Sequence, residues 1–301
     1  MVTSWTATKP EPLESITLAD VGARVRQIEA EKIDLQVIYP TLFLAHPLTD
    51  DAAFQTALVR CYNSWVAEVC GRRSDKLKWV GLVNLEDAAG AAAEVERVRG
   101  SGGIGVMTLG TVGDRKLDDP RLDPFYAALC QQRLPLAVHV GWPSPSLAYI
   151  YEDVYDALVL PFTVSMFTGF LDIVGGGVLD RFPDLKVAFF EAGCEWIPFL
   201  LDRMDHYYEI AVERKRWAAH TRQAPSAYVR SGNVYFGYEV EDELLPYVLK
   251  KIGEDQFVFA SDIPHGDRFP AAVDYLLGRQ DLSETAKKKL LGENALRFYG
   301  L

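Results

Sequence analysis

The sequence predicts an α/β fold built on a parallel β-sheet, because short apolar segments alternate with helical patterns along almost all of its 301 residues. Most of these apolar segments are continuous rather than alternating, as expected for parallel strands that are covered on both faces. The chain has no internal repeat and no linker rich in Pro, Gly or Ser. We therefore expect one domain over residues 1–301, with residues 1–17 forming an irregular N-terminal segment.

Seven segments are predicted strands, and they share runs of Val, Ile, Leu, Phe and Ala. They are Asp34–Thr41, Lys78–Asn84, Gly103–Leu109, Pro135–Val140, Lys186–Glu191, Asn233–Glu239 and Phe257–Ser261. A barrel of eight strands needs one more, and the only place left lies before the helix that begins near Leu18. The segment Val2–Thr8 has strand propensity and could be a short substitute.

Helical patterns lie between the predicted strands, near residues 18–32, 50–72, 87–99, 121–132, 151–174, 195–215 and 241–252. The last predicted helix covers residues 283–298. Ser283 and Glu284 begin it, since a serine followed by an acidic residue is typical of a capped helix N-terminus.

Composition excludes several classes of partner. The net charge of −11 and the lack of dense Lys/Arg runs beyond residues 287–289 argue against nucleic acid and anionic membranes. The apolar runs are short and interrupted, so we expect no membrane span. The N-terminus lacks the order of a signal peptide, and the four cysteines lack metal-type spacing. These features predict a cytoplasmic protein with reduced thiols that acts on a small molecule.

Three residues with metal-ligand or acid/base chemistry follow predicted strands: His139, Glu191 and Asp262. In a βα barrel the C-terminal ends of the strands form the rim where active sites are built. Imidazole nitrogen and carboxylate oxygen are both common ligands of zinc and similar ions. We therefore expect these residues to form one site, although they lie far apart in the sequence.

Each of the three residues also has an ordinary structural explanation. His139 could be a core histidine whose ring is satisfied by a backbone carbonyl. Asp262 could be a turn aspartate, since aspartate is common shortly before proline. A buried Glu191 is costly unless it is paired, and Arg203 on the next predicted helix could be its partner.

Taken together, these residues and the sequence segments around them resemble the amidohydrolase superfamily. The resemblance is strongest to the "amidohydrolase 2" branch, which includes aminocarboxymuconate-semialdehyde decarboxylase and related aromatic-acid decarboxylases. It covers roughly residues 18–301, and the sequence segments on which it rests occur in the same order as in the family. They are Asp34–Thr41, Arg181–Val187, Glu191–Asp205, Ala260–His265 and Leu291–Leu301.

The resemblance implies a distorted TIM-like (β/α) barrel with one divalent metal at the C-terminal rim. His139 matches the family's fifth-strand histidine and Asp262 its eighth-strand aspartate, whereas Glu191 stands where a sixth-strand histidine is often found. The first strand, with its H-x-H ligand motif, is expected to be missing or replaced, because Met1 falls after its position. Family members are often dimers, so the resemblance also implies a homodimer.

We therefore expect a metal-dependent hydrolase that activates a water molecule on a small organic substrate. Zinc is the first choice of metal, with manganese and iron as alternatives. Asp262 would be both ligand and base, His139 a ligand, and Glu191 a ligand or catalytic orienting group. Trp142 and His265 would contact the substrate. Two alternatives stay open: non-oxidative decarboxylation of an aromatic or enol acid, and a metal-free barrel that acts as a binding subunit.

Overall fold

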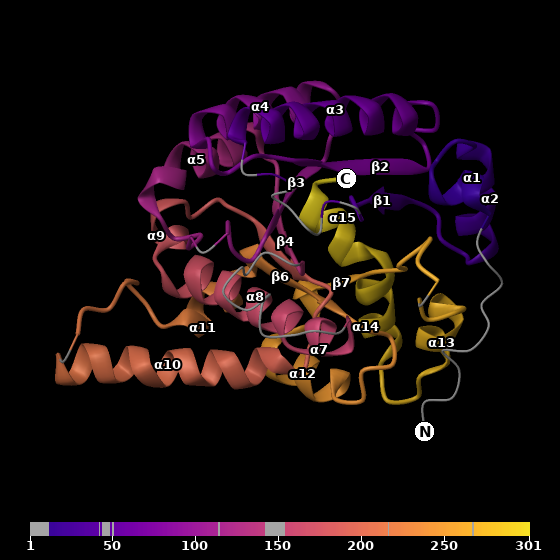
Figure 1. Cartoon of the computed structure of the whole chain (residues 1–301). Helices are drawn as coiled ribbons and strands as arrows, with labels where there is room; N and C mark the ends of the chain where they lie inside the picture. Colours follow the sequence, from indigo (N-terminus) through magenta and orange to yellow (C-terminus); the bar gives the residue numbers. More distant parts are fainter. Residues whose placement is uncertain are drawn as a thin grey trace.

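The computed structural model of the chain describes residues 12–41, 43, 49, 51–113, 115–141, 154–215, 217–266 and 268–301. Val2–Thr8 and Trp142 lie outside the described residues, so the expectations for the substitute strand and for one substrate contact stay predictions. Figure 1 shows a curved sheet with helices around its outside, from α3 and α4 at the top to α8 and α12 at the bottom.

The sheet has seven parallel strands in the order β1-β2-β3-β4-β5-β6-β7. This curled sheet with outer helices is a distorted TIM-like α/β barrel, which confirms the predicted fold class. All seven predicted strands are found within the described ranges. They are β1 (Gln36–Ile38), β2 (Leu77–Leu82), β3 (Gly105–Leu109), β4 (Leu136–His139), β5 (Val187–Phe190), β6 (Val234–Tyr238) and β7 (Phe257–Phe259).

The predicted helical segments are found in the structure, and two of them differ from the prediction in detail. The predicted helix at 151–174 is divided at Pro161, which cannot donate a backbone hydrogen bond, and ends in a π-helical turn. The helix predicted at 283–298 also contains a π-helical turn, while Ser283 caps it as expected by accepting a hydrogen bond from the Ala286 amide at 3.0 Å. The long helices around the barrel are α2 (Val21–Ala30), α3 (Ala52–Gly71), α4 (Ala88–Gly100), α5 (Asp123–Gln132), α8 (Pro161–Phe170), α10 (Trp196–Arg214) and α12 (Leu245–Ile252).

Shorter helices complete the described chain. They are α1 (Leu13–Ile16), α7 (Val154–Val159), α9 (Val178–Arg181), α11 (Pro225–Tyr228), α13 (Ala272–Gly278), α14 (Glu284–Lys288) and α15 (Asn294–Tyr299). Single helical turns are η2 (Pro120–Leu122), η3 (Leu171–Gly175), η4 (Val229–Asn233), η5 (Glu254–Gln256) and η6 (Lys289–Glu293).

One helical stretch among the described residues, Pro161–Arg181, is long and apolar enough to cross a membrane by length and composition alone. In its most apolar part, 56% is buried inside the protein. The side chains of Phe170, Ile173 and Val178 are fully buried in the core. A core helix of a folded domain has this same pattern, so the stretch is weak evidence for a membrane span.

Apolar side chains fill both sides of the sheet. The larger cluster lies between the strands and the surrounding helices, and the smaller one lies on the inner, concave side. The C-terminal helix α15 contributes Phe298 and Tyr299 to the inner cluster, where the Phe298 ring packs against Phe190 and Tyr235. The helix, yellow in Figure 1, therefore fills part of the barrel interior.

Within the described ranges, β1 pairs only with β2 and β7 only with β6, so the sheet does not close. Side chains bridge the gap between its edges. The Gln36 amide on β1 donates to the Ile263 carbonyl after β7 at 2.9 Å, and Arg24 donates to Gln36 at 3.3 Å. The barrel is thus held together here by polar contacts in place of strand pairing, in agreement with the expected distortion.

Candidate active site

Four polar residues end neighbouring strands at the same rim of the sheet. His139 is the last residue of β4, Glu191 directly follows β5, and Glu239 directly follows β6. Asp262 lies just beyond β7. Because β4, β5, β6 and β7 are parallel neighbours in that order, their C-terminal ends bring these residues to one side of the molecule.

The imidazole of His139 contacts the carboxylate of Glu191, with 3.3 Å between Nε2 and Oε2. Its other nitrogen, Nδ1, lies 2.9 Å from the carbonyl oxygen of Val140. A carbonyl can only accept, so Nδ1 carries the hydrogen and the Nε2 lone pair of a neutral ring faces Glu191. Two acceptors face each other in that arrangement, and a proton or a cation between them is required to make the contact favourable.

The spacing of this pair suits two ligands of one metal ion. Donor atoms bound tetrahedrally at the usual lengths of zinc–nitrogen and zinc–oxygen bonds lie about 3.4 Å apart. The Nδ1–H to carbonyl hydrogen bond is also the support that metal-binding histidines usually have. Among the described residues Arg203 is not seen to pair with Glu191, and its guanidinium donates to the Tyr207 hydroxyl.

Glu191 and Asp262 both have left-handed backbone conformations, with φ of 71° and 49°. Such conformations cost an L-residue about 1–2 kcal/mol and persist where the surrounding structure enforces them, often at functional sites. In a regular strand the residue after Phe190, which faces the inner cluster, would face outward. The left-handed turn breaks this alternation, and the Glu191 carboxylate meets His139.

Glu239 is a site residue that the sequence pattern did not single out. Tyr238 belongs to the outer cluster, so strand alternation places Glu239 on the inner side. Burial first, and then the charges of Asp262, Asp242, Glu241 and Glu191 in that order, together raise the pKa of Glu239 to about 8. Glu239 thus holds a proton near neutral pH. In the sequence it resembled one of several acids that favour a helix N-terminus.

Asp242 ties together the two connections that carry Glu191 and Glu239. Its Oδ2 accepts the backbone amides of Cys194 and Glu239, each at 3.1 Å. Within the described ranges, Cys194, Glu195 and Asp242 form a group whose donor atoms all lie within 4.8 Å. Burial, followed by the charge of Asp242, raises the pKa of the Cys194 thiol, which keeps it protonated. We interpret this group as a structural contact that holds the two connections together.

The predicted ligands are less tightly grouped. Among the described residues, His139, Glu191 and Asp262 do not form a set with all donor atoms within 4.8 Å. Asp262 is near enough to raise the pKa of Glu239. His265 lies on the same turn, where its amide donates to the Asp262 carbonyl at 2.5 Å and its Nε2 is 3.1 Å from the Thr41 hydroxyl.

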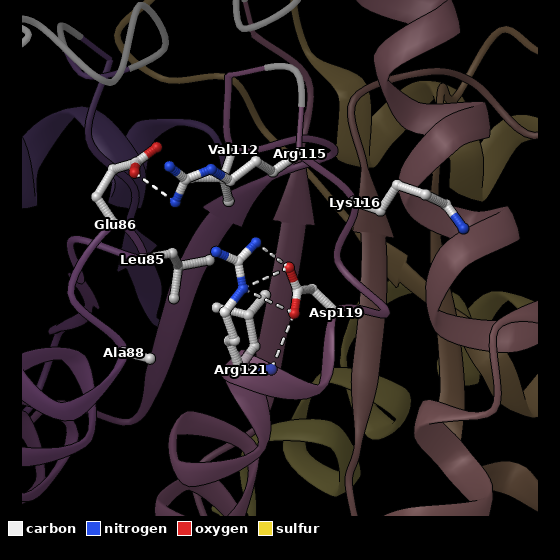
Figure 2. Close-up of a pocket in the computed structure, with 9 residues that line it drawn as sticks. Leu85, Glu86, Ala88, Val112, Arg115, Lys116, Asp119 and Arg121 are labelled. Atoms are coloured by element: carbon white, nitrogen blue, oxygen red, sulfur yellow. Dashed lines mark hydrogen bonds and ion pairs between the residues drawn. The ribbon is translucent and has the colours of Figure 1, made fainter.

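A hollow of the surface lies elsewhere, between the connections after β2 and β3 (Figure 2). Its cationic side chains are already paired with acids. Arg115 contacts Glu86 at 2.6 Å, Arg121 pairs with Asp119 through several hydrogen bonds, and Lys116 contacts Asp118 at 2.7 Å. The hollow therefore offers no excess positive charge for an anionic ligand and is not our candidate site.

Comparison with known proteins identifies curated relatives. The chain is 26% identical over 293 residues to 2-amino-3-carboxymuconate-6-semialdehyde decarboxylase of Dictyostelium discoideum, covering 94% of this chain and 77% of that protein. It is 24% identical over 254 residues to gamma-resorcylate decarboxylase of Rhizobium radiobacter, covering 81% and 76%.

Solved structures share the fold. The 5-carboxyvanillate decarboxylase of Novosphingobium aromaticivorans, solved with bound manganese, superposes with a TM-score of 0.80 at 21% identity, covering 92% of this chain and 80% of that chain. An amidohydrolase of Mycobacterium avium subsp. paratuberculosis superposes with a TM-score of 0.82 at 24% identity, covering 93% and 74%. The family model Amidohydro_2, described as amidohydrolase, matches residues 31–301. Because this match covers most of the sequence, the chain belongs to the Amidohydro_2 family of amidohydrolases.

Proposed function

We propose that this protein is a metal-dependent carboxy-lyase that removes CO₂ from a small aromatic or enol carboxylic acid without oxidation. The observation that carries the proposal is the contact between His139 and Glu191 at the barrel rim of an Amidohydro_2 chain. Two curated relatives are decarboxylases, which favours this reaction over the hydrolysis that we expected from the sequence.

His139, Glu191 and Asp262 are the residues that would hold the metal. A site with one imidazole and several carboxylates suits manganese at least as well as zinc, because oxygen ligands favour harder ions. Manganese in the related 5-carboxyvanillate decarboxylase structure supports the same choice, so manganese replaces zinc as our first expectation. A bound divalent ion supplies a Lewis acid that polarises an oxygen of the substrate.

The protein's own residues must supply the proton that replaces CO₂. When the bond between the carboxyl group and the adjacent carbon breaks, its electron pair stays on that carbon, which then takes up a proton. Asp262 and Glu239 are two carboxyl groups whose charges repel each other, so one of them keeps a proton near neutral pH. We assign the proton transfer to this pair, with solvent restoring the proton after each turnover.

The polar residues of the hollow in Figure 2 are outside this assignment and offer a matched control. The test compares wild type with Asp262→Asn, His139→Asn and Asp119→Asn, each stripped of metal and then supplied with Mn²⁺. CO₂ release is measured from 2,6-dihydroxybenzoate and 5-carboxyvanillate, substrate types of the solved relatives. We expect the rate of CO₂ release by Asp262→Asn to be about 100-fold or more below that of wild type, and Asp119→Asn to release CO₂ at the wild-type rate.

Two outcomes would contradict the proposal. Metal-dependent cleavage of esters or amides without CO₂ release from any aromatic acid would restore the hydrolase hypothesis. Protein that binds no metal and turns over none of these compounds, with His139→Asn indistinguishable from wild type, would support a binding subunit without catalysis.

A further inference from the structure

Tyr39 lies between the C-terminal helix and the candidate site. It directly follows β1, and its ring stacks on the imidazole of His139 with ring centroids 5.7 Å apart and planes inclined by 27°. Its hydroxyl is 2.6 Å from the hydroxyl of Tyr299, on α15. A continuous chain of contacts therefore links the last helix of the described chain to the histidine of the site.

The surroundings leave this chain of contacts little freedom. The edge of Phe190 meets the Tyr39 ring at 5.9 Å and 85°, and Phe298 packs against Phe190 at 5.9 Å. Tyr299 is buried and Tyr39 is half-buried, and loss of solvent around the hydroxyls raises the pKa of both. The two hydroxyls therefore stay neutral and satisfy each other in the barrel interior, where a hydroxyl without a partner is costly.

Three contacts determine the orientation of His139. The Val140 carbonyl holds Nδ1, the Glu191 carboxylate faces Nε2, and the Tyr39 ring covers one face of the imidazole. Rotation of an imidazole about its last torsion is otherwise soft, so a stacked ring limits the tilt of its plane. The hydrogen bond to Tyr299 in turn limits how far Tyr39 can move.

We infer that Tyr299 is a positioning residue for His139 and acts through Tyr39. Its hydroxyl fixes the Tyr39 ring, whose face keeps His139 Nε2 directed at Glu191. That this orientation matters for turnover rests on the proposed function, whereas the orientation itself does not. Tyr235 provides a matched control, because its buried ring packs against Phe298 of the same helix at 5.0 Å, in a different place from the Tyr39–Tyr299 hydrogen bond.

The experiment uses full-length protein labelled with ¹⁵N-histidine. The chain has only five histidines, so His139→Gln assigns the His139 ring signals. Long-range ¹H–¹⁵N spectra of metal-free wild type are expected to show His139 with its hydrogen on Nδ1. In Tyr299→Phe and Tyr39→Phe we expect these signals to shift or broaden, and Mn²⁺ to bind about tenfold more weakly. The double variant should be no worse than either single one, because both hydroxyls belong to one hydrogen bond.

Unchanged His139 signals and unchanged Mn²⁺ affinity in folded Tyr299→Phe would overturn the inference. So would an equal change in Tyr235→Phe, which would mean that any loosening of α15 has the same effect. If wild type releases no CO₂ and binds no Mn²⁺, the proposed function fails, while the His139 spectra still decide whether Tyr299 positions the imidazole.

Discussion

The imidazole of His139 and the carboxylate of Glu191 face each other at 3.3 Å from the ends of adjacent strands. The Val140 carbonyl holds the hydrogen of the imidazole on Nδ1, so Nε2 presents a lone pair to a group that also only accepts when ionised. This arrangement calls for a positive charge between the two residues. A proton on Nε2 would supply it, and so would the divalent metal that we propose for this rim.

Glu191 should set the metal preference of the site. In Glu191→His, an imidazole replaces a carboxylate at the position where the resemblance in the sequence led us to expect a histidine. Because imidazole suits zinc and carboxylate suits manganese, the ratio of Zn²⁺ to Mn²⁺ affinity should rise about tenfold or more. Competition titrations against a chelator with known affinities measure this ratio. An unchanged ratio in a folded variant would show that Glu191 is not a ligand.

Glu239 should make the stability of metal-free protein depend on pH. Its pKa is about 8 in the folded protein and near 4.5 in the unfolded chain, so the folded state binds the extra proton between these values. The free energy of unfolding contributed by Glu239 therefore falls as pH rises from about 5 to about 8, by at most about 1.4 kcal/mol per pH unit. Below that window the contribution is fully present, and above it the loss is complete.

The variant Glu239→Gln removes this titration. Urea unfolding at several pH values in EDTA should show a flatter profile for Glu239→Gln than for wild type, with the largest gain in relative stability at alkaline pH. Glu213→Gln changes an exposed glutamate on α10 and should leave the profile unchanged. Parallel profiles for wild type and Glu239→Gln would contradict the buried, protonated state of Glu239.

Asp242 should stabilise the fold mainly through the hydrogen bonds that its side-chain oxygen accepts, and less through its charge. In Asp242→Ala the amides of Cys194 and Glu239 lose their acceptor, at a cost of about 1–3 kcal/mol for each amide that stays buried. Asp242→Asn keeps an amide oxygen that can accept the same hydrogen bonds and should lose much less. Thermal and urea unfolding compare the two. Equal losses in the alanine and asparagine variants would mean that a cation or the charge itself is what Asp242 supports.

The strands were predictable because burial on both faces requires apolar residues at consecutive positions, which can be recognised in the local sequence. Continuous apolar runs such as Pro135–Val140 and Lys186–Glu191 need no knowledge of distant residues to be identified. The cap at Ser283 was predictable for the same reason. The break at Pro161 was missed because the apolar pattern continues through it.

The site was only partly predictable. The position of His139, Glu191 and Asp262 at one rim was predictable because strand ends in parallel sheets meet there, but the contact between His139 and Glu191 depends on a left-handed φ that the sequence does not specify. Glu239 was hidden among acids that also suit a helix N-terminus. The hydrogen bond between Tyr39 and Tyr299 joins residues that are 260 positions apart, and no local sequence pattern predicts it.

The measurement that tests the central claim most directly is the manganese content of protein that has been stripped of metal, supplied with Mn²⁺ and freed of excess. Elemental mass spectrometry of wild type should find about one Mn²⁺ per chain, with His139→Asn and Asp262→Asn close to zero and Asp119→Asn like wild type. Wild-type protein that is folded but retains no Mn²⁺, or a His139→Asn variant that retains as much as wild type, would contradict a metal centre at this rim.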